Sequence, residues 1–147
     1  RESLIEFLPD FKSNQIELQL RIPENKCMVR ADYLSLTRII RNLVKNALVY
    51  GKEGGVLGVE IVERKKEYHL LIWDQGPGIP REELERVFDR MYRGDLSRSH
   101  FNQGSGLGLA IAKALVEKNN GSIWVESTSW EKTVIGFSLP KENKRPI

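Results

Sequence analysis

Three glycines at alternate positions, Gly104, Gly106 and Gly108, form the stretch whose residue types are best suited to holding an anion. They open a segment in which apolar residues recur with the spacing of one helix face. Glycine lets the backbone approach a ligand closely, and the unpaired N–H groups at the start of a helix attract phosphate. The stretch has neither the Gly-Lys-Ser/Thr of a P-loop nor the Gly-x-Gly-x-x-Gly of a dinucleotide site. Taken alone, it indicates either a phosphate-binding loop or an ordinary glycine-rich loop.

Two asparagines and one aspartate are the other polar residues whose positions suggest a function. Asn42 and Asn46 are four residues apart in a predicted helix, so their side chains share one face, although asparagine is a poor helix former. Asp74 follows a strand pattern and enters the glycine turn 76–78. Each has an ordinary alternative: the asparagines can be surface residues, and aspartate is frequent in turns.

Residues 89–103 have little periodicity and are rich in Arg, Ser, Gly and Asn. Irregular stretches of this length often act as lids over a site. Arg90, Arg93 and Arg98 are therefore candidates for contacting anionic oxygens, and the alternative is that they face solvent. No histidine, cysteine or carboxylate cluster has the spacing of a metal site, and His69 alternates with apolar residues as a sheet residue would.

The elements that must position these residues follow from the hydrophobic pattern. Helices are predicted over 2–12, from the N-cap Asp32 to about Tyr50, over 81–88, and from Leu107 to a left-handed cap at 119–121. Strands are predicted over 15–22, 27–30, 56–62, 68–73, 122–127 and 133–139. This order predicts an α/β (α+β) fold, a two-layer sandwich of a mixed, mostly antiparallel sheet packed against three helices.

The composition fits one globular domain and excludes several classes of protein. The 147 residues are enough for a single core, and we expect 1–140 to form the domain and 141–147 a flexible tail. A net charge of +3, without basic runs interleaved with aromatics, does not favour nucleic acid. The single Cys27 excludes an internal disulfide and fits a reducing compartment.

No signal peptide or membrane-spanning run is present, so no direct membrane contact is expected. Because the sequence begins at Arg1, we expect it to be a piece of a longer protein.

Four motifs stand in an order and spacing that resemble a known family. They are Asn42-Leu-Val-Lys-Asn46-Ala47, Asp74-x-Gly76-x-Gly78, Phe88-Asp-Arg-Met-Tyr92-Arg93 and Gly104-x-Gly106-Leu-Gly108. Together they resemble the N, G1, F and G2 boxes of the ATP-binding catalytic domain of bacterial two-component sensor histidine kinases, in the GHKL superfamily. Each box alone is weak evidence for this family, and the four boxes in this order are highly specific for it. The resemblance covers about residues 1–140 and implies the GHKL ATP-binding fold, with ATP and Mg²⁺ as cofactors.

The first two boxes imply the adenine and magnesium contacts. Asp74 resembles the aspartate that accepts a hydrogen bond from the adenine amino group, and a buried carboxylate there would reject guanine. Asn46 resembles the amide that ligates Mg²⁺, a cation that prefers oxygen donors. Asn42 lies one turn earlier, near the phosphates. The remaining nucleotide contacts implied by these boxes are Tyr50, Gly76, Gly78 and Ile79.

The last two boxes imply the lid. Tyr92 resembles the aromatic residue beside the nucleotide, and Arg93 resembles a phosphate contact. The residues that correspond to the lid hinge and the phosphate cradle are Gly104, Ser105, Gly106, Leu107 and Gly108. The sequence departs from the family at Val49, where a lysine often reaches the phosphates. It also departs at 130–133, where Trp-Glu-Lys-Thr replaces a Gly-x-Gly-Thr turn.

The resemblance implies a protein-histidine kinase that passes the γ-phosphate of ATP to a histidine on a separate phosphoacceptor domain of the same parent protein. Neither His69 nor His100 lies in a phosphoacceptor motif, so this chain is expected to contain no nucleophile or catalytic base and not to label itself. In the family the phosphate then moves to a response regulator. Dimerisation is expected through the missing domain, with this fragment monomeric. The location implied is a cytoplasmic domain of a membrane-anchored bacterial sensor.

Two alternatives remain within the same fold. ATPase relatives such as DNA gyrase carry Glu-x-x-x-Asn, in which the glutamate activates water as a general base. This chain has Asn42 at the glutamate position, and a neutral amide cannot take that proton, which favours the kinase. The second alternative is a nucleotide-sensing module without chemistry. The intact boxes argue against it, and Val49 argues faintly for it.

Overall fold

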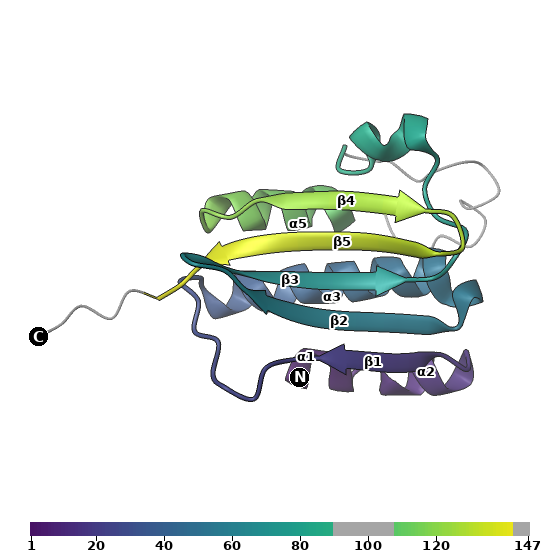
Figure 1. The fold of residues 1–147 in the computed structure, drawn as a ribbon, viewed down its shortest axis with the longest axis horizontal. Helices are drawn as coiled ribbons and strands as arrows, with labels where there is room; N and C mark the ends of the chain where they lie inside the picture. Colours follow the sequence, from purple (N-terminus) through teal and green to yellow (C-terminus); the bar gives the residue numbers. More distant parts are fainter. Residues whose placement is uncertain (90–107, 143–147) are drawn as a thin grey trace, which may run out of the picture.

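The computed structural model of the chain describes residues 1–89 and 108–142, and Figure 1 shows how its elements are arranged. The helices are α1 (Glu2–Ile5), α2 (Leu8–Ser13), α3 (Tyr33–Gly51) and α5 (Gly108–Lys118), with the 3-10 helices η1 (Lys52–Gly54) and η2 (Arg81–Arg86). The strands are β1 (Glu17–Arg21), β2 (Val56–Glu63), β3 (Glu67–Asp74), β4 (Ile123–Thr128) and β5 (Lys132–Pro140).

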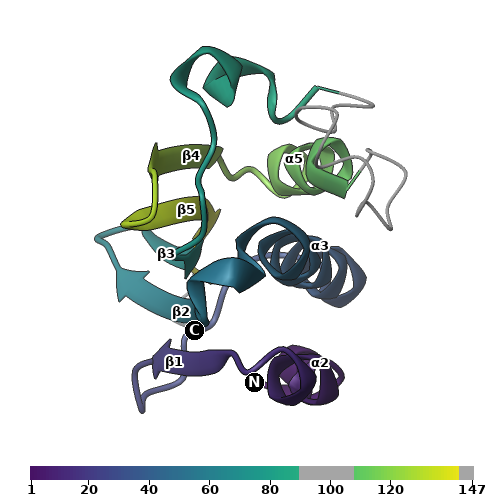
Figure 2. The same ribbon diagram turned by 90° about the vertical axis from the view of Figure 1, so that its right-hand side faces the viewer.

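The strands form one sheet in the order β1-β2-β3-β5-β4. β1 pairs with β2 in parallel, and the other neighbours are antiparallel. Figure 2 shows the sheet with α2, α3 and α5 side by side on one of its faces. This arrangement confirms the predicted fold, a two-layer sandwich of a mixed, mostly antiparallel sheet against three helices.

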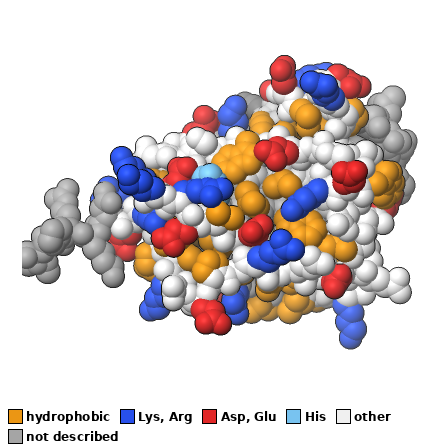
Figure 3. All heavy atoms as spheres, in the orientation of Figure 1, with side chains coloured by type: hydrophobic (Ala, Val, Ile, Leu, Met, Phe, Trp, Pro, Cys, Tyr) orange, Lys and Arg blue, Asp and Glu red, His pale blue; other side chains and the backbone are white. Residues whose placement is uncertain are grey.

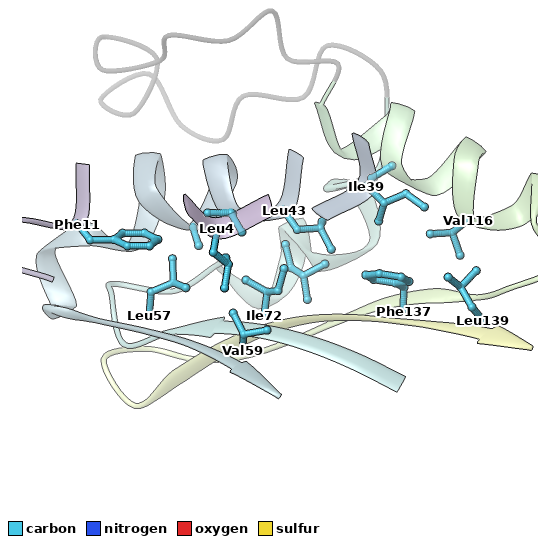
Figure 4. Packing of buried hydrophobic residues seen from close by; sticks show 14 residues of the cluster. Leu4, Phe11, Ile39, Leu43, Leu57, Val59, Ile72, Val116, Phe137 and Leu139 are labelled. Carbon is cyan, nitrogen blue, oxygen red and sulfur yellow. The ribbon is translucent and has the colours of Figure 1, made fainter. Parts of the chain in front are cut away.

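The core lies between α3 and the sheet. Ile39, Leu43 and Val44 of α3 are almost completely buried, in one cluster with Ile72 of β3 and Phe137 of β5 (Figure 4). Burying a large apolar side chain of this kind contributes about 1.5–3 kcal/mol. One face of α3 is therefore fixed by the core, which leaves the opposite face available for polar residues.

Helix α3 begins where the sequence predicts, directly after Asp32. Asp32 is its N-cap, and its carboxylate accepts a hydrogen bond of 3.0 Å from the Ser35 backbone N–H. The Ser35 hydroxyl donates to the other carboxylate oxygen. The bond from the hydroxyl and then the bond from the backbone N–H lower the pKa of Asp32, because both favour its charged form.

The predicted helix over 2–12 is instead two short helices, α1 and α2. Proline has no backbone N–H, and its ring clashes with the carbonyl four residues earlier, so one continuous helix cannot run from residue 2 through Pro9. Pro9 lies in the first turn of α2, where its missing N–H costs no hydrogen bond.

Two further segments are less regular than predicted. Residues 27–30, expected to be a strand, form a single bridge between Val29 and Lys141. The helix expected over 81–88 is the shorter 3-10 helix η2. Of the expected tail over 141–147, only Lys141 and Glu142 lie within the described residues, and both donate backbone hydrogen bonds to other segments. In the described part of the chain, no helix is long and apolar enough to cross a membrane.

The sheet face that the helices leave uncovered carries apolar side chains among charged ones (Figure 3). Trp73 on this face packs against Gly58, where a Cβ atom would come within 1.9 Å of its ring. The ammonium group of Lys132 lies 4.6 Å from the centre of the Trp73 ring. A cation over the indole face is a favourable contact, and only 5% of Trp73 is exposed although it lies on the face that the helices leave uncovered.

Candidate functional site

The polar face of α3 is one side of the candidate site. Asn42 and Asn46 are half-buried there, one turn apart. The side-chain amide of Asn42 donates a hydrogen bond of 3.2 Å to the carbonyl oxygen of Gly108, the first residue of α5. Two predicted site residues that are far apart in sequence are therefore brought together. Tyr50 lies one turn beyond Asn46 on the same helix and is also half-buried.

Asp74 is the other side of the site. It is the last residue of β3, and only 6% of it is exposed. Its Oδ1 atom accepts a hydrogen bond of 2.9 Å from the Gly76 backbone N–H. Because a buried carboxylate is costly unless it is hydrogen-bonded, this bond both stabilises Asp74 and fixes its orientation.

Gly51, the last residue of α3, packs directly on the Asp74 carboxyl group. A Cβ atom on Gly51 would lie 2.1 Å from the Asp74 Cγ, so no larger residue fits without movement. A Cβ atom on Gly76 would in turn lie 2.7 Å from the Gly51 Cα. The end of α3 and the turn after β3 therefore touch through backbone atoms. The sequence predicts that the helix ends near Tyr50, and it gives no indication of this contact.

The sheet register adds further polar residues on the same side as Asp74. Asp74 is the cross-strand partner of Thr133 on β5, and Thr133 is the partner of Ser127 on β4. Thr133 is 6% exposed, and its hydroxyl oxygen lies 2.7 Å from that of Ser127. Cross-strand partners point to the same face of a sheet, and Ile72 of the core shares that face with Asp74. The three side chains therefore line the helix-facing side at one end of the sheet.

Ser127 connects this row to the glycine turn. Its hydroxyl oxygen accepts a hydrogen bond of 2.9 Å from the Ile79 backbone N–H. Gly78 beside it has a φ of +85°, a conformation that favours glycine, and a Cβ atom there would lie 2.9 Å from the Ser127 hydroxyl oxygen. The sequence did carry a signal for Ser127, because it follows Ile123 and Val125 at a core-facing position of the strand pattern. A serine at such a position needs a specific partner.

The hairpin turn between β4 and β5 holds residues 76 and 77 of the glycine turn through two hydrogen bonds. The Ser129 hydroxyl donates a hydrogen bond of 2.7 Å to the carbonyl oxygen of Pro77. The Trp130 backbone N–H donates one of 2.9 Å to the carbonyl oxygen of Gly76. The departure from the family pattern at 130–133 therefore falls at a segment that supports the loop through its backbone. Sequence reasoning missed Ser129 and Trp130 as loop contacts.

Several predicted site residues lie outside the described residues. They are Tyr92, Arg93, Gly104, Ser105, Gly106 and Leu107.

Asn42 and Val49 line a cavity of about 690 Å³ on the outer side of α3. The described residues include no group of three or more histidine, cysteine or acidic side chains that could hold a metal ion. Mg²⁺ usually keeps several waters and takes few protein ligands beside substrate phosphates, so one amide oxygen from Asn46 fits its requirements.

Comparisons with known proteins agree with this geometry. A family model described as "Histidine kinase-, DNA gyrase B-, and HSP90-like ATPase" matches residues 31–143. The sensor histidine kinase WalK of Bacillus subtilis is 35% identical over 136 residues, which cover 91% of this chain and 22% of WalK. The probable sensor kinase SilS of Salmonella typhimurium is 44% identical over 127 residues, which cover 86% of this chain and 25% of SilS. The chain thus spans about a quarter of the length of these relatives.

Solved structures give the same result. The catalytic domain of histidine kinase ThkA superposes with a TM-score of 0.82 at 25% identity, covering 96% of this chain and 90% of that chain. The mycobacterial sensor histidine kinase MprB superposes with a TM-score of 0.78 at 31% identity, covering 97% of this chain and 96% of that chain. The fold and the arrangement of the described elements are therefore those of sensor histidine kinase catalytic domains.

Proposed function

The chain belongs to the family of histidine kinase-, DNA gyrase B- and HSP90-like ATPases, and from this premise we propose that it binds Mg-ATP as the catalytic domain of a two-component sensor. It donates the γ-phosphate to a histidine on a separate phosphoacceptor domain of the parent protein. Residues 1–140 form this domain. A response regulator receives the phosphate afterwards, and dimerisation occurs through the phosphoacceptor domain. The proposed location is the cytoplasmic side of a membrane-anchored sensor.

The orientation of Asp74 is the observation that carries this proposal. Its carboxylate is buried at the end of β3 and bonded to the Gly76 N–H over 2.9 Å. A carboxylate offers about four acceptor positions, so it can accept a hydrogen bond from an exocyclic amino group in addition to its bonds within the protein. Adenine has such a donor and guanine has a carbonyl at that position, which supports selection of ATP over GTP.

Asn46 and Asn42 serve the phosphate end. Asn46 contributes an amide oxygen to Mg²⁺, and the bound ion neutralises phosphate charge. Tyr50 contacts the nucleotide from the end of the same helix. The loop residues 76–79 form the wall beside the base, held by Ser127 through the Ile79 N–H. The proposed lid contacts are Tyr92, Arg93, Gly104, Ser105, Gly106, Leu107 and Gly108.

The role of Asn42 supports a kinase rather than an ATPase. Its amide nitrogen is a hydrogen-bond donor to the Gly108 carbonyl, and an amide has no basic site that could take a proton from water. The nucleophile must then come from another domain.

Calorimetry with ATP tests the adenine contact. Replacing Asp74 by Asn exchanges a charged acceptor for a neutral amide, so we expect a loss of about 1.5–3 kcal/mol in binding free energy. The control is Glu126→Gln, the same type of change at an exposed position of β4, which should leave the affinity unchanged. Equal ATP affinity in the wild type and Asp74→Asn would contradict the proposal.

A further inference from the structure

A basic groove lies on the outer side of α3, between α2 and α3. It is the cavity of about 690 Å³ that Asn42 and Val49 line. Four basic residues, Arg38, Arg41, Lys45 and Lys52, also line it. Among the described residues, Asp10 of α2 is the only acidic residue in its lining. The groove therefore has a clear excess of positive charge, although the whole chain is nearly balanced.

The cations of the groove differ in whether they have a partner. Arg41 forms an ion pair of 2.8 Å with Glu6 of the segment after α1. The side chains of Lys45 and Lys52 are exposed, and within residues 1–89 and 108–142 neither ammonium group has an ion-pair or hydrogen-bond partner. Among the residues that the structure describes, no carboxylate has to be displaced before these two ammonium groups take up an anion.

The helix places both lysines around Val49. Lys45 is four residues before Val49 and Lys52 is three residues after it, and such neighbours are adjacent on a helix surface. Val49 is half-buried and carries no charge at the position where the family resemblance leads us to expect a lysine. A lysine side chain is a flexible four-carbon stem, so both ammonium groups can reach the space beside Val49.

We propose that Lys45 and Lys52 bind phosphates of the nucleotide and supply the positive charge that position 49 lacks. The inference rests on the proposed function, because it extends the ATP site along the outer face of α3. Asn42, which lines the same groove, connects the two regions. The ligand class of the groove is a polyphosphate, held by two mobile cations.

Separate probes for the two ends of the nucleotide test this inference. Tripolyphosphate reports on the groove, adenosine reports on the adenine site, and ATP reports on both. In calorimetry at low salt, Lys45→Ala and Lys52→Ala should each weaken tripolyphosphate and ATP about threefold, and the double variant about tenfold. Adenosine affinity should not change. The losses should shrink at high salt, because exposed charge–phosphate contacts are screened.

Two further variants exclude trivial explanations. Lys65→Ala removes the same charge from the exposed turn between β2 and β3, at the opposite end of β3 from Asp74, and should change nothing. Asp10→Asn removes the acidic residue of the groove, so it should tighten tripolyphosphate binding about twofold to threefold. An increase in affinity cannot result from misfolding.

The outcomes separate this inference from the proposed function. The lysine groove is overturned as a phosphate site, and the adenine site stands, if adenosine binds but tripolyphosphate does not. The same holds if adenosine binds and the tripolyphosphate affinity of the double variant equals that of the wild type. An equal loss of adenosine affinity in the lysine variants would also overturn it. If tripolyphosphate binding depends on both lysines but adenosine does not bind, the groove stands and the adenine site fails.

Discussion

A Cβ atom on Gly51 would meet all three terminal atoms of the Asp74 side chain, the Cγ at 2.1 Å and the carboxylate oxygens at 2.4 and 2.5 Å. The carboxylate is therefore positioned by the hydrogen bond from Gly76 on one side and by a bare backbone on the other. A site built in this way depends on residues that contribute no functional group of their own.

Gly51→Ala should for this reason weaken ATP binding by tenfold or more, because about 1.4 kcal/mol is lost when Asp74 is displaced. Replacing a glycine by alanine inside a helix normally stabilises it by about 0.5–1 kcal/mol. The free energy of unfolding should instead fall. Urea denaturation and calorimetry on the same variant measure both effects, and a stabilised variant with normal ATP affinity would refute the contact.

Ser127→Ala should weaken ATP binding by about 1 kcal/mol, because the Ile79 N–H loses its acceptor and the loop over 76–79 is no longer fixed. Ser127→Thr keeps the hydroxyl and should restore most of the affinity. Thr128→Ala, an exposed neighbour on β4, is the matched control. Calorimetry with ATP distinguishes the three variants, and equal losses in the alanine and threonine variants would contradict the role of the hydroxyl.

At the scale of elements, α3 carries most of the site. Its buried face holds it to the sheet, its polar face presents Asn42 and Asn46, and its last residue supports Asp74. The positions of Asn42, Asn46 and Gly51 depend on where α3 starts, and the Asp32 cap sets that start.

The stability that the Asp32 cap contributes should depend on pH. Its pKa is lowered in the folded chain from the usual 3.8, so the contribution is complete above about that pH and disappears as the pH falls through the folded value. The difference in unfolding free energy between the wild type and Asp32→Ala should therefore be constant near neutral pH and shrink in acid. Urea denaturation between about pH 2.5 and pH 7 measures it. A difference that grows in acid would contradict the assignment of the cap.

The elements themselves were largely predictable from the sequence. α3 with its cap and the two hairpins follow from apolar periods of 3.6 and 2, which are local properties. The errors fell on short segments. They are the split at Pro9, the single bridge at Val29 and the 3-10 helix η2. In segments this short, tertiary contacts outweigh the local pattern of apolar residues.

The supporting residues of the site were harder to predict. Asp74 and Asn42 stand in motifs, but the contacts of Gly51 and Ser127 join segments that are far apart in the chain. Such contacts depend on the sheet register and on the packing of α3, which no local pattern specifies. Only the serine at a core-facing strand position gave a hint.

At the scale of the whole molecule, the proposed function gives this chain the contacts to the nucleotide and places the nucleophile on another domain. The isolated chain should bind ATP without hydrolysing it appreciably and without labelling itself, since phosphoryl transfer needs an in-line nucleophile. With γ-labelled ATP, the histidine-bearing domain of the same parent protein should acquire acid-labile phosphate when it is added. Asn46→Ala should abolish this transfer. Robust ATP turnover by the chain alone would favour the ATPase alternative. Labelling of His69 or His100 would contradict the expectation that the nucleophile lies on another domain.

The strand order also has a consequence for biosynthesis. β5, the last of the described strands, lies between β3 and β4, so the sheet cannot close until the chain has left the ribosome as far as Pro140. Until then β3 offers an unpaired edge, and such edges invite association with other nascent chains. A stop codon before β5 would therefore leave two sheet fragments with exposed edges, and such a product is expected to be degraded or to aggregate.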